Sequence, residues 1–239
     1  MAPRFYVDRV LTPDSTIVLP EKTAHHASRV LRMREGDSAV LFDGKGNEAE
    51  AILHFFADRT EAQIQTVRQS LTESPLKTVL IQALVSQEKL DWILEKATEL
   101  GVTKIIVVPA ERSVTKLDEK RLAKRLLQWK NTTLSACEQC ARSLLPEVIY
   151  SPNLKSALSD NKTERNFILA PGARNSLKLT DIQSVTFAVG PEGGFSQTEI
   201  EMAQSLGYEC ALLGPRVLRT ETAGLAALAV AQTLAGDFR

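Results

Sequence analysis

Two glycine-bearing loops near the C-terminus carry the residue types that could build a ligand site. They span residues 190–196 and 213–223, and each follows an apolar segment and precedes a predicted helix. Neither loop has the Lys-Ser/Thr pair that closes a P-loop, and neither has the G-x-G-x-x-G spacing of dinucleotide-binding turns. A ligand held through its phosphate groups is therefore not expected.

The backbone of such loops suits a flat heterocyclic ligand. Glycine allows positive φ angles and close approach, so bare N–H and C=O groups can bind the edge of a base. Pro191 and Pro215 restrict the loops and reduce the entropy lost when they order around a ligand. Plain strand-to-helix turns also contain glycine and proline, which is the alternative for either loop alone. The charged residues of the two loops are Glu192, Arg216, Arg219 and Glu221. Two such loops close together, with these charged residues, favour a ligand site over plain turns.

Alternating strands and helices are expected to position these loops. Strands are predicted at 78–86, 104–108, 147–150, 166–170, 184–189 and 209–213, and helices at 90–100 and 118–143. This alternation is typical of a parallel sheet. Pro146 is expected to end the long helix. Ser196 and Glu199 have the spacing of a capping box for the helix that follows the first loop.

The N-terminal part of the chain has a different pattern. Short apolar runs separated by turn signals predict strands at 16–19, 38–42, 48–56 and 61–67, which together favour a small β-barrel. Residues 22–33 are predicted to form one helix, and residues 43–47 a hairpin loop. The polar stretch 69–75 breaks all periodicity. We therefore expect two domains, residues 1–72 and 73–239.

Charge is balanced overall and uneven locally. The chain has 29 basic and 29 acidic residues, which argues against a uniformly basic coat for nucleic acid. Residues 1–34 nevertheless hold six basic and three acidic groups, and residues 111–130 hold seven and three. These two islands predict surfaces that attract phosphate. A solvated helix face is the alternative for the second island.

No targeting or metal-binding pattern stands out. The first ten residues interleave charges with apolar residues, unlike a secretory signal, and Ala223–Ala235 is too short to span a membrane. An odd number of cysteines, three, fits a reducing compartment, so we expect a cytoplasmic protein. Cys137 and Cys140 lack further ligands nearby, so no metal site is expected and helix packing is the favoured interpretation.

Five phrases of the sequence carry a resemblance to a known family. Residues 190–194 (GPEGG) and 213–222 (LGPRVLRTET) closely resemble the bacterial RsmE-type enzymes, and residues 26–32, 90–101 and 136–142 agree with them. These enzymes methylate N3 of a uridine in 16S ribosomal RNA. The resemblance spans nearly the whole chain, and the Leu-Arg-Thr-Glu-Thr phrase is its most specific part.

The resemblance implies an S-adenosylmethionine-dependent methyltransferase of the SPOUT class. Its implied fold is a PUA-like N-terminal barrel and a C-terminal α/β domain with a parallel sheet and a deep trefoil knot. Periodicity alone cannot distinguish a knotted sheet from a doubly wound one, and threading is rare. The resemblance also implies a homodimer that acts on 16S ribosomal RNA or the small ribosomal subunit. S-adenosylmethionine carries no phosphate, in agreement with the loop spacing.

The expected cofactor site draws on three successive strand ends, where ligands of open α/β sheets bind. Its predicted residues are Ala170, Pro171, Gly190, Pro191, Glu192, Gly193, Gly194, Leu213, Gly214, Val217, Leu218 and Thr220.

The implied reaction also needs proton and charge handling. Uridine N3 must lose a proton before or during transfer, and Glu221 and Glu138 are the candidate acceptors. Charge that spreads to O2 and O4 could be stabilised by Arg219 or Arg142. The target base is expected to be unpaired or extruded. The predicted RNA contacts are Arg4, Arg29, Arg32 and Arg34 in the N-terminal domain, with Lys89, Arg112 and Arg142 near the cleft.

Two alternatives stay open at the level of sequence. One is a non-catalytic RNA-binding factor in ribosome assembly, against which the intact glycine loops argue. The other is a SPOUT methyltransferase that acts on a different RNA.

Overall fold

The structure is a computed structural model, and it describes residues 2–170 and 177–238. The chain separates into two units. Unit 1 comprises Met1–Glu73 with Cys137–Leu145, and unit 2 comprises Ser74–Ala136 with Pro146–Arg239. The segment 137–145, which the sequence analysis assigned to the C-terminal domain, thus groups with the N-terminal residues. Its contacts are the reason, because Glu138 Oε1 accepts a hydrogen bond from the Tyr6 amide at 3.2 Å.

Unit 1 is built on a five-stranded sheet with the order β1-β3-β4-β5-β2. The strands are β1 (Arg4–Tyr6), β2 (Thr16–Val18), β3 (Ser38–Phe42), β4 (Asn47–Phe55) and β5 (Thr60–Gln69). β1 and β3 run parallel, and the other pairs are antiparallel. Along β5, Ala62 and Ile64 alternate with less buried residues, so one face of the sheet packs on the core.

The predicted helix 22–33 of unit 1 takes a less regular form. It begins as α1 (Glu21–His25) and continues as a π-helical turn, η1 (His26–Val30). Arg32 then has a φ of +56°, in the left-handed region, so the helix cannot continue to residue 33. The helical segment ends at Val30, three residues earlier than predicted.

Unit 2 contains a six-stranded sheet with the order β11-β9-β10-β6-β7-β8, and every pair in it is parallel. The strands are β6 (Lys77–Ala83), β7 (Lys104–Val108), β8 (Glu147–Tyr150), β9 (Arg165–Leu169), β10 (Ser184–Val189) and β11 (Glu209–Ala211). The helices are α2 (Gln87–Glu99), α3 (Glu119–Cys140), α4 (Leu154–Asp160), α5 (Gln197–Ser205) and α6 (Thr220–Ala235). The predicted alternation is confirmed.

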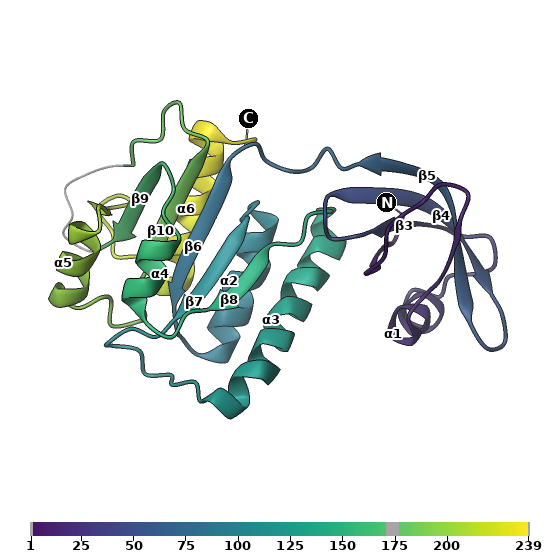
Figure 1. The fold of residues 1–239 in the computed structure, drawn as a ribbon, viewed down its shortest axis with the longest axis horizontal. Coiled ribbons are helices and arrows are strands. Elements are labelled where there is room, and N and C mark those ends of the chain that lie inside the picture. Colours follow the sequence, from purple (N-terminus) through teal and green to yellow (C-terminus); the bar gives the residue numbers. More distant parts are fainter. Residues whose placement is uncertain (1, 171–176, 239) are drawn as a thin grey trace. The chain divides into compact units, whose positions relative to one another are not determined.

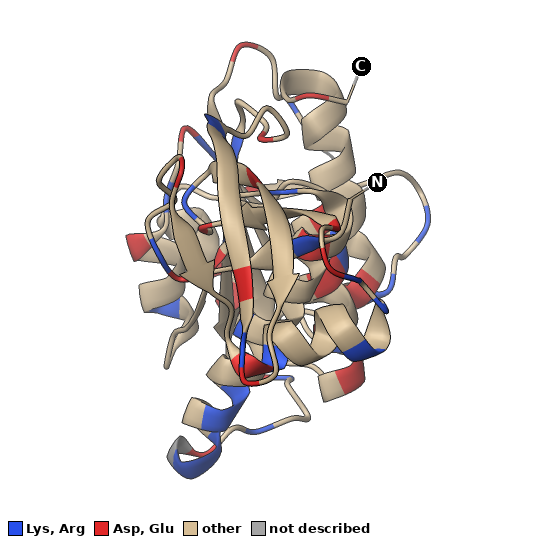
Figure 2. Ribbon diagram, turned by 90° about the vertical axis from the view of Figure 1, so that its right-hand side faces the viewer, with Lys and Arg blue, Asp and Glu red and all other residues tan. Residues whose placement is uncertain are grey.

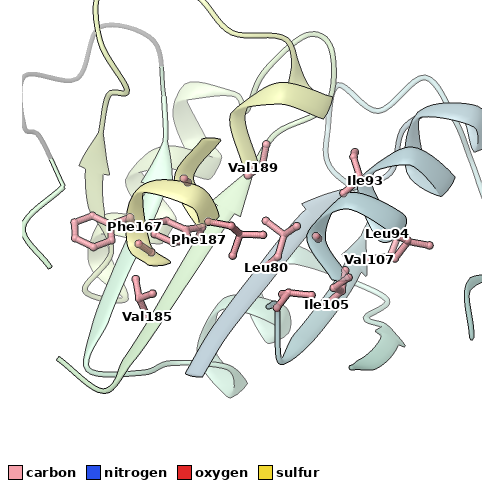
Figure 3. Close-up of a cluster of buried hydrophobic side chains, with 14 of the residues drawn as sticks. Leu80, Ile93, Leu94, Ile105, Val107, Phe167, Val185, Phe187 and Val189 are labelled. Atoms are coloured by element: carbon pink, nitrogen blue, oxygen red, sulfur yellow. The ribbon is translucent and has the colours of Figure 1, made fainter. Parts of the chain in front are cut away.

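Helices cover both faces of this sheet (Figure 1). On one face, α2 and α6 pack against side chains such as Leu80 and Phe187 (Figure 3). On the other face, α4 and α5 pack against side chains such as Ile81 and Ile168. Burial on both faces explains why the strands appear in the sequence as continuous apolar runs.

Helix ends in unit 2 partly follow the sequence. The capping box is present, since the Ser196 hydroxyl accepts from the Glu199 amide and the Glu199 carboxylate accepts from the Ser196 amide. The expectation that Pro146 ends the long helix is wrong. Helix α3 ends at Cys140, because Ala141 adopts a φ of +67°. No described helix is both long and apolar enough to cross a bilayer.

Candidate active site

A cavity of about 580 Å³ lies in unit 2, at the carboxyl ends of β9, β10 and β11. Open α/β sheets bind ligands at this edge. The lining residues are Lys89, Leu169, Ala170, Val189, Gly190, Pro191, Glu192, Gly194, Ala211, Leu212, Leu213, Pro215, Arg216, Val217, Leu218, Arg219, Thr220, Glu221 and Ala223. The two glycine loops are thus brought together at one site.

The first loop turns sharply at the end of β10. The Gly194 amide donates to the Pro191 carbonyl at 2.9 Å, and Gly194 has a φ of +67°. A Cβ atom on Gly190 would lie 2.8 Å from the Phe195 amide nitrogen and 2.9 Å from the Gly194 carbonyl carbon. Because both obstacles are backbone atoms, position 190 has no room for a side chain.

A buried hydroxyl joins the two loops. Thr220, the first residue of α6, donates through Oγ1 to the Gly190 carbonyl at 2.6 Å. The same oxygen accepts from Gln82 Nε2, at 3.0 Å, near the end of β6. Gln82 is not among the predicted site residues, although a glutamine inside an apolar strand was an available signal. The end of β6, the first glycine loop and the start of α6 are therefore held together beside the cavity.

Charged side chains occupy one side of the cavity. Lys89 Nζ lies 2.8 Å from Glu192 Oε1 and 3.8 Å from Glu221 Oε2, and Arg219 lies 4.0 Å from Glu221. The hydrogen bond to Glu192 raises the pKa of Lys89. Burial opposes ionisation of Glu192, but the hydrogen bond from Lys89 outweighs it and lowers the pKa of that carboxyl. Glu221 Oε2 is buried and accepts no hydrogen bond within the described part of the chain.

Most predicted cofactor residues line this cavity. The members that do so are Ala170, Gly190, Pro191, Glu192, Gly194, Leu213, Val217, Leu218 and Thr220. Gly193 and Gly214 are not among its lining residues, and Pro171 lies outside the described residues. The carbonyl of Gly193 instead accepts from Arg112 Nη1 at 3.1 Å.

The lining includes residues that the sequence analysis did not assign to the cofactor. The apolar ones, at strand ends and in the second loop, are Leu169, Val189, Ala211, Leu212, Pro215 and Ala223. Their signal was available, since the last residue of a parallel strand borders the loop that follows it.

The four predicted catalytic residues separate into two groups. Arg219 and Glu221 line the cavity of unit 2. Arg142 and Glu138 belong to unit 1. The Arg142 side chain is 5% exposed and forms an ion pair with Glu73 at 2.9 Å, and burial raises the pKa of Glu138. These contacts give both residues a structural role, and their catalytic role stays a prediction.

The predicted RNA contacts also differ in their surroundings. Arg29, Arg32 and Arg34 are exposed. The Arg4 side chain is 7% exposed and pairs with Glu48 at 3.0 Å, which leaves little of it for RNA. Lys89 lines the cavity, and Arg112 donates to the Gly193 carbonyl of the first glycine loop, so the contact of these two residues with RNA stays a prediction. Among the described residues, no cluster of three or more His, Cys, Asp or Glu could hold a metal ion.

Comparisons with known proteins define the class. The RNA methyltransferase domain family matches residues 72–232, and the RNA methyltransferase PUA domain family matches residues 19–54. The chain is thus an RNA methyltransferase with a PUA domain, which confirms the expected combination of a parallel α/β domain with a small N-terminal β domain.

Individual relatives narrow this class. Two proteins named ribosomal RNA small subunit methyltransferase E are similar over most of their length: one from Buchnera aphidicola is 30% identical, covering 99% of this chain and 95% of the relative, and one from Bacillus subtilis is 32% identical, covering 89% and 88%. The enzyme of that name from Neisseria gonorrhoeae, solved with S-adenosyl methionine, has a TM-score of 0.91 and 40% identity with full coverage of both chains. A putative methyltransferase from Legionella pneumophila, solved with the same cofactor, has a TM-score of 0.94, 34% identity and full coverage of both chains. The chain belongs to the ribosomal RNA small subunit methyltransferase E family.

Proposed function

We propose that this protein uses S-adenosylmethionine to methylate N3 of a uridine in the 16S RNA of the small ribosomal subunit. The observation that carries the proposal is the cavity walled by the two glycine loops. Family membership supports the reaction class, and the relatives' names support the ribosomal substrate. Action in the cytoplasm follows from this substrate.

The chemistry of the cavity fits an adenosyl ligand. Its walls are mainly apolar side chains and main chain, with few charged groups, which suits an adenosine whose base is read by backbone N–H and C=O groups. The bare backbone at Gly190 and Gly194 permits close approach. Glu221 Oε2 has almost no exposed surface and accepts no hydrogen bond from the described residues, so a movement of this side chain would let it accept one from a ligand. Residues from all three strand ends would hold the cofactor.

The cofactor supplies an electrophilic methyl group, and the protein supplies proton and charge handling. We assign Glu221 as the acceptor of the uridine N3 proton, because it is the lining carboxylate with a hydrogen-bonding site to spare. Arg219, beside it, would donate to the uracil oxygens where negative charge develops. Lys89, 3.8 Å from Glu221 Oε2, would orient this carboxylate between turnovers.

A homodimer and a trefoil knot in unit 2 form part of the proposal. Helix α6 has no charged residue from Thr222 to Ala235, and Val230 and Leu234 on its outer side are 36% and 56% exposed. A helix that is apolar all round is typical of a buried one. A second copy of the chain is the occupant that we propose for this face.

Residues 1–72 would bind RNA, and residues 73–239 would carry the catalysis.

Two measurements test the proposed function. Calorimetric titration with S-adenosylhomocysteine should give saturable heat, and small subunits from cells that lack the gene should gain one methyl group when incubated with the protein and S-adenosylmethionine. Primer extension should then stop at a single uridine, because methylated N3 cannot pair. Saturable binding of S-adenosylhomocysteine without any new primer-extension stop would refute the uridine-N3 assignment. No binding of S-adenosylhomocysteine would refute the proposed cofactor.

A further inference from the structure

The cluster of cations at the start of α3 has no role in the site described above. Lys116 lies just before the helix, and Lys120, Arg121, Lys124 and Arg125 lie in its first two turns. By their spacing Lys120, Arg121 and Lys124 lie on the exposed side of the helix, and Arg125, four residues before the buried Trp129, borders its buried side. Figure 2 shows this end of the helix, at the bottom of the view, as a run of basic positions. We call these five residues the α3 basic surface.

This placement works against helix stability. Lys120 and Lys124, like Arg121 and Arg125, are like charges four residues apart, which repel. Cations near a helix N-terminus also face the positive end of the helix dipole. Asp118, 3.4 Å from Arg121, is the acidic partner that the described side chains provide. Asp118 offsets only part of this repulsion, and a sequence that departs from local helix preferences in two ways indicates a function for the surface.

The α3 basic surface adjoins the cavity within unit 2. Arg125 hydrogen-bonds to Gln87, which lies two residues before the cavity residue Lys89 on α2. On the other side, Arg112 donates to the Gly193 carbonyl of the first glycine loop, four residues before Lys116. Arg125 and Arg112 thus connect the start of α3 and the loop before it to residues beside the cavity.

We propose that the α3 basic surface binds the sugar-phosphate backbone of the substrate RNA next to the target nucleotide. The inference rests on the proposed function and adds a contact surface to it. Its exposed lysines stand one turn apart on a solvent face, so they match a continuous line of negative charge and supply no groups arranged to read a base. Contacts of this kind fix register and orientation on the RNA.

The test compares two triple variants. The first, Lys116→Gln with Lys120→Gln and Lys124→Gln, removes three charges from the surface and keeps good helix formers. The control, Lys77→Gln with Lys162→Gln and Lys178→Gln, removes three exposed charges elsewhere in the same unit. Circular dichroism and binding of S-adenosylhomocysteine should be unchanged for both, which shows that the variants are folded.

RNA binding is then measured directly, with protein-free 16S RNA over a range of salt concentrations. For single strands, each phosphate contact adds roughly 0.7 to the magnitude of the slope of log affinity against log salt concentration. The slope of the first variant should therefore be smaller in magnitude than that of the wild type by about two, and the slope of the control should be unchanged. In methylation assays the first variant should raise KM severalfold with little change in kcat. Equal slopes for the variant and the wild type would overturn the proposal.

Two further outcomes separate this inference from the proposed function. If the wild-type protein binds RNA with the expected slope but methylates nothing, the proposed function fails while the surface stands. If the first variant loses affinity for intact small subunits but binds protein-free RNA like the wild type, the surface contacts a ribosomal protein, and the RNA proposal is wrong.

Discussion

The hydroxyl of Thr220 donates a hydrogen bond to the carbonyl of Gly190 at 2.6 Å, across 30 residues of chain. Both atoms are buried, and the same hydroxyl accepts from Gln82. This contact ties the start of α6 to the first glycine loop, so the shape of the cavity depends on one side chain that supplies both a donor and an acceptor.

Replacement of Thr220 by valine should therefore open the cavity. The substitution keeps the shape and leaves the Gly190 carbonyl and the Gln82 amide without their partner, which should lower the free energy of unfolding by about 1–3 kcal/mol. Denaturant titration and S-adenosylhomocysteine binding would measure the effect. Thr220→Ser keeps the hydroxyl and should stay close to the wild type in both; a valine variant with wild-type affinity would contradict the role of the bond.

Replacement of Gly190 by alanine should disrupt the cofactor site more than the same change at Gly193. The added Cβ at 190 meets backbone atoms at 2.8 and 2.9 Å, whereas at 193 the nearest atom is the Arg112 Cβ at 3.2 Å, a contact that a much smaller shift relieves. We expect Gly190→Ala to weaken S-adenosylhomocysteine binding by tenfold or more, about 1.4 kcal/mol. Calorimetry on both variants measures which substitution weakens S-adenosylhomocysteine binding more, and equal affinities would contradict this prediction.

Glu221→Gln should separate binding from catalysis. If Glu221 accepts the N3 proton, kcat should fall by about 10²–10⁴-fold, while cofactor affinity should change little because the amide keeps the size of the side chain. Single-turnover methylation of small subunits measures the first quantity. Glu192→Gln serves as the control, because it removes the other lining carboxylate that contacts Lys89. A variant that retains most of its kcat would remove Glu221 from the mechanism.

Acid should weaken unit 1 through Glu48. Burial raises the pKa of Glu48, but hydrogen bonds from Arg68, Arg4 and Ser143 outweigh it, so the net pKa is lowered from its ordinary 4.5. A lowered carboxyl pKa contributes stability that is complete above the ordinary value and is lost as pH falls through the folded pKa. Glu48→Gln should thus cost roughly 3 kcal/mol at pH 7, and its deficit should shrink below about pH 4.5. Urea unfolding at several pH values tests this; a deficit independent of pH would exclude the ionic contribution.

A charge on the outer side of α6 should prevent the proposed dimer. Leu234→Glu places a carboxylate on a face that would become buried between two copies, where an unpaired charge is strongly unfavourable. Sedimentation velocity should then show a monomer. Leu71→Glu, at a leucine that is 96% exposed in unit 1, is the matched control and should leave the dimer intact. A dimeric Leu234→Glu variant would place the interface elsewhere.

Local patterns predicted much of the fold and the cofactor loops. Parallel strands buried on both faces, the capping box at Ser196 and the glycine turns all depend on residues close together in sequence. The end of α3 did not follow from Pro146, because the left-handed conformation of Ala141 has no glycine or asparagine to signal it.

Charged residues were the hardest to interpret from sequence. Arg4 was predicted to contact RNA, and Arg142 to contact RNA or the reacting base. In the structure each is buried against a carboxylate distant in the chain, Glu48 for Arg4 and Glu73 for Arg142. Gln82 could not be connected to Thr220 for the same reason, since 138 residues separate them. Pairings of this kind depend on tertiary structure, which periodicity does not encode.

The segment 137–145 has a consequence for how this protein can be divided or recombined. Unit 1 is discontinuous in sequence, because its Tyr6 amide and Arg4 guanidinium are bonded to Glu138 and Ser143, which the chain supplies only after most of α3 has been made. A fragment that stops at residue 73 lacks these partners. Exchange of residues 1–73 between relatives at one crossover point would combine them with a segment 137–145 from another protein, so a folded chimera should require that both segments come from the same parent.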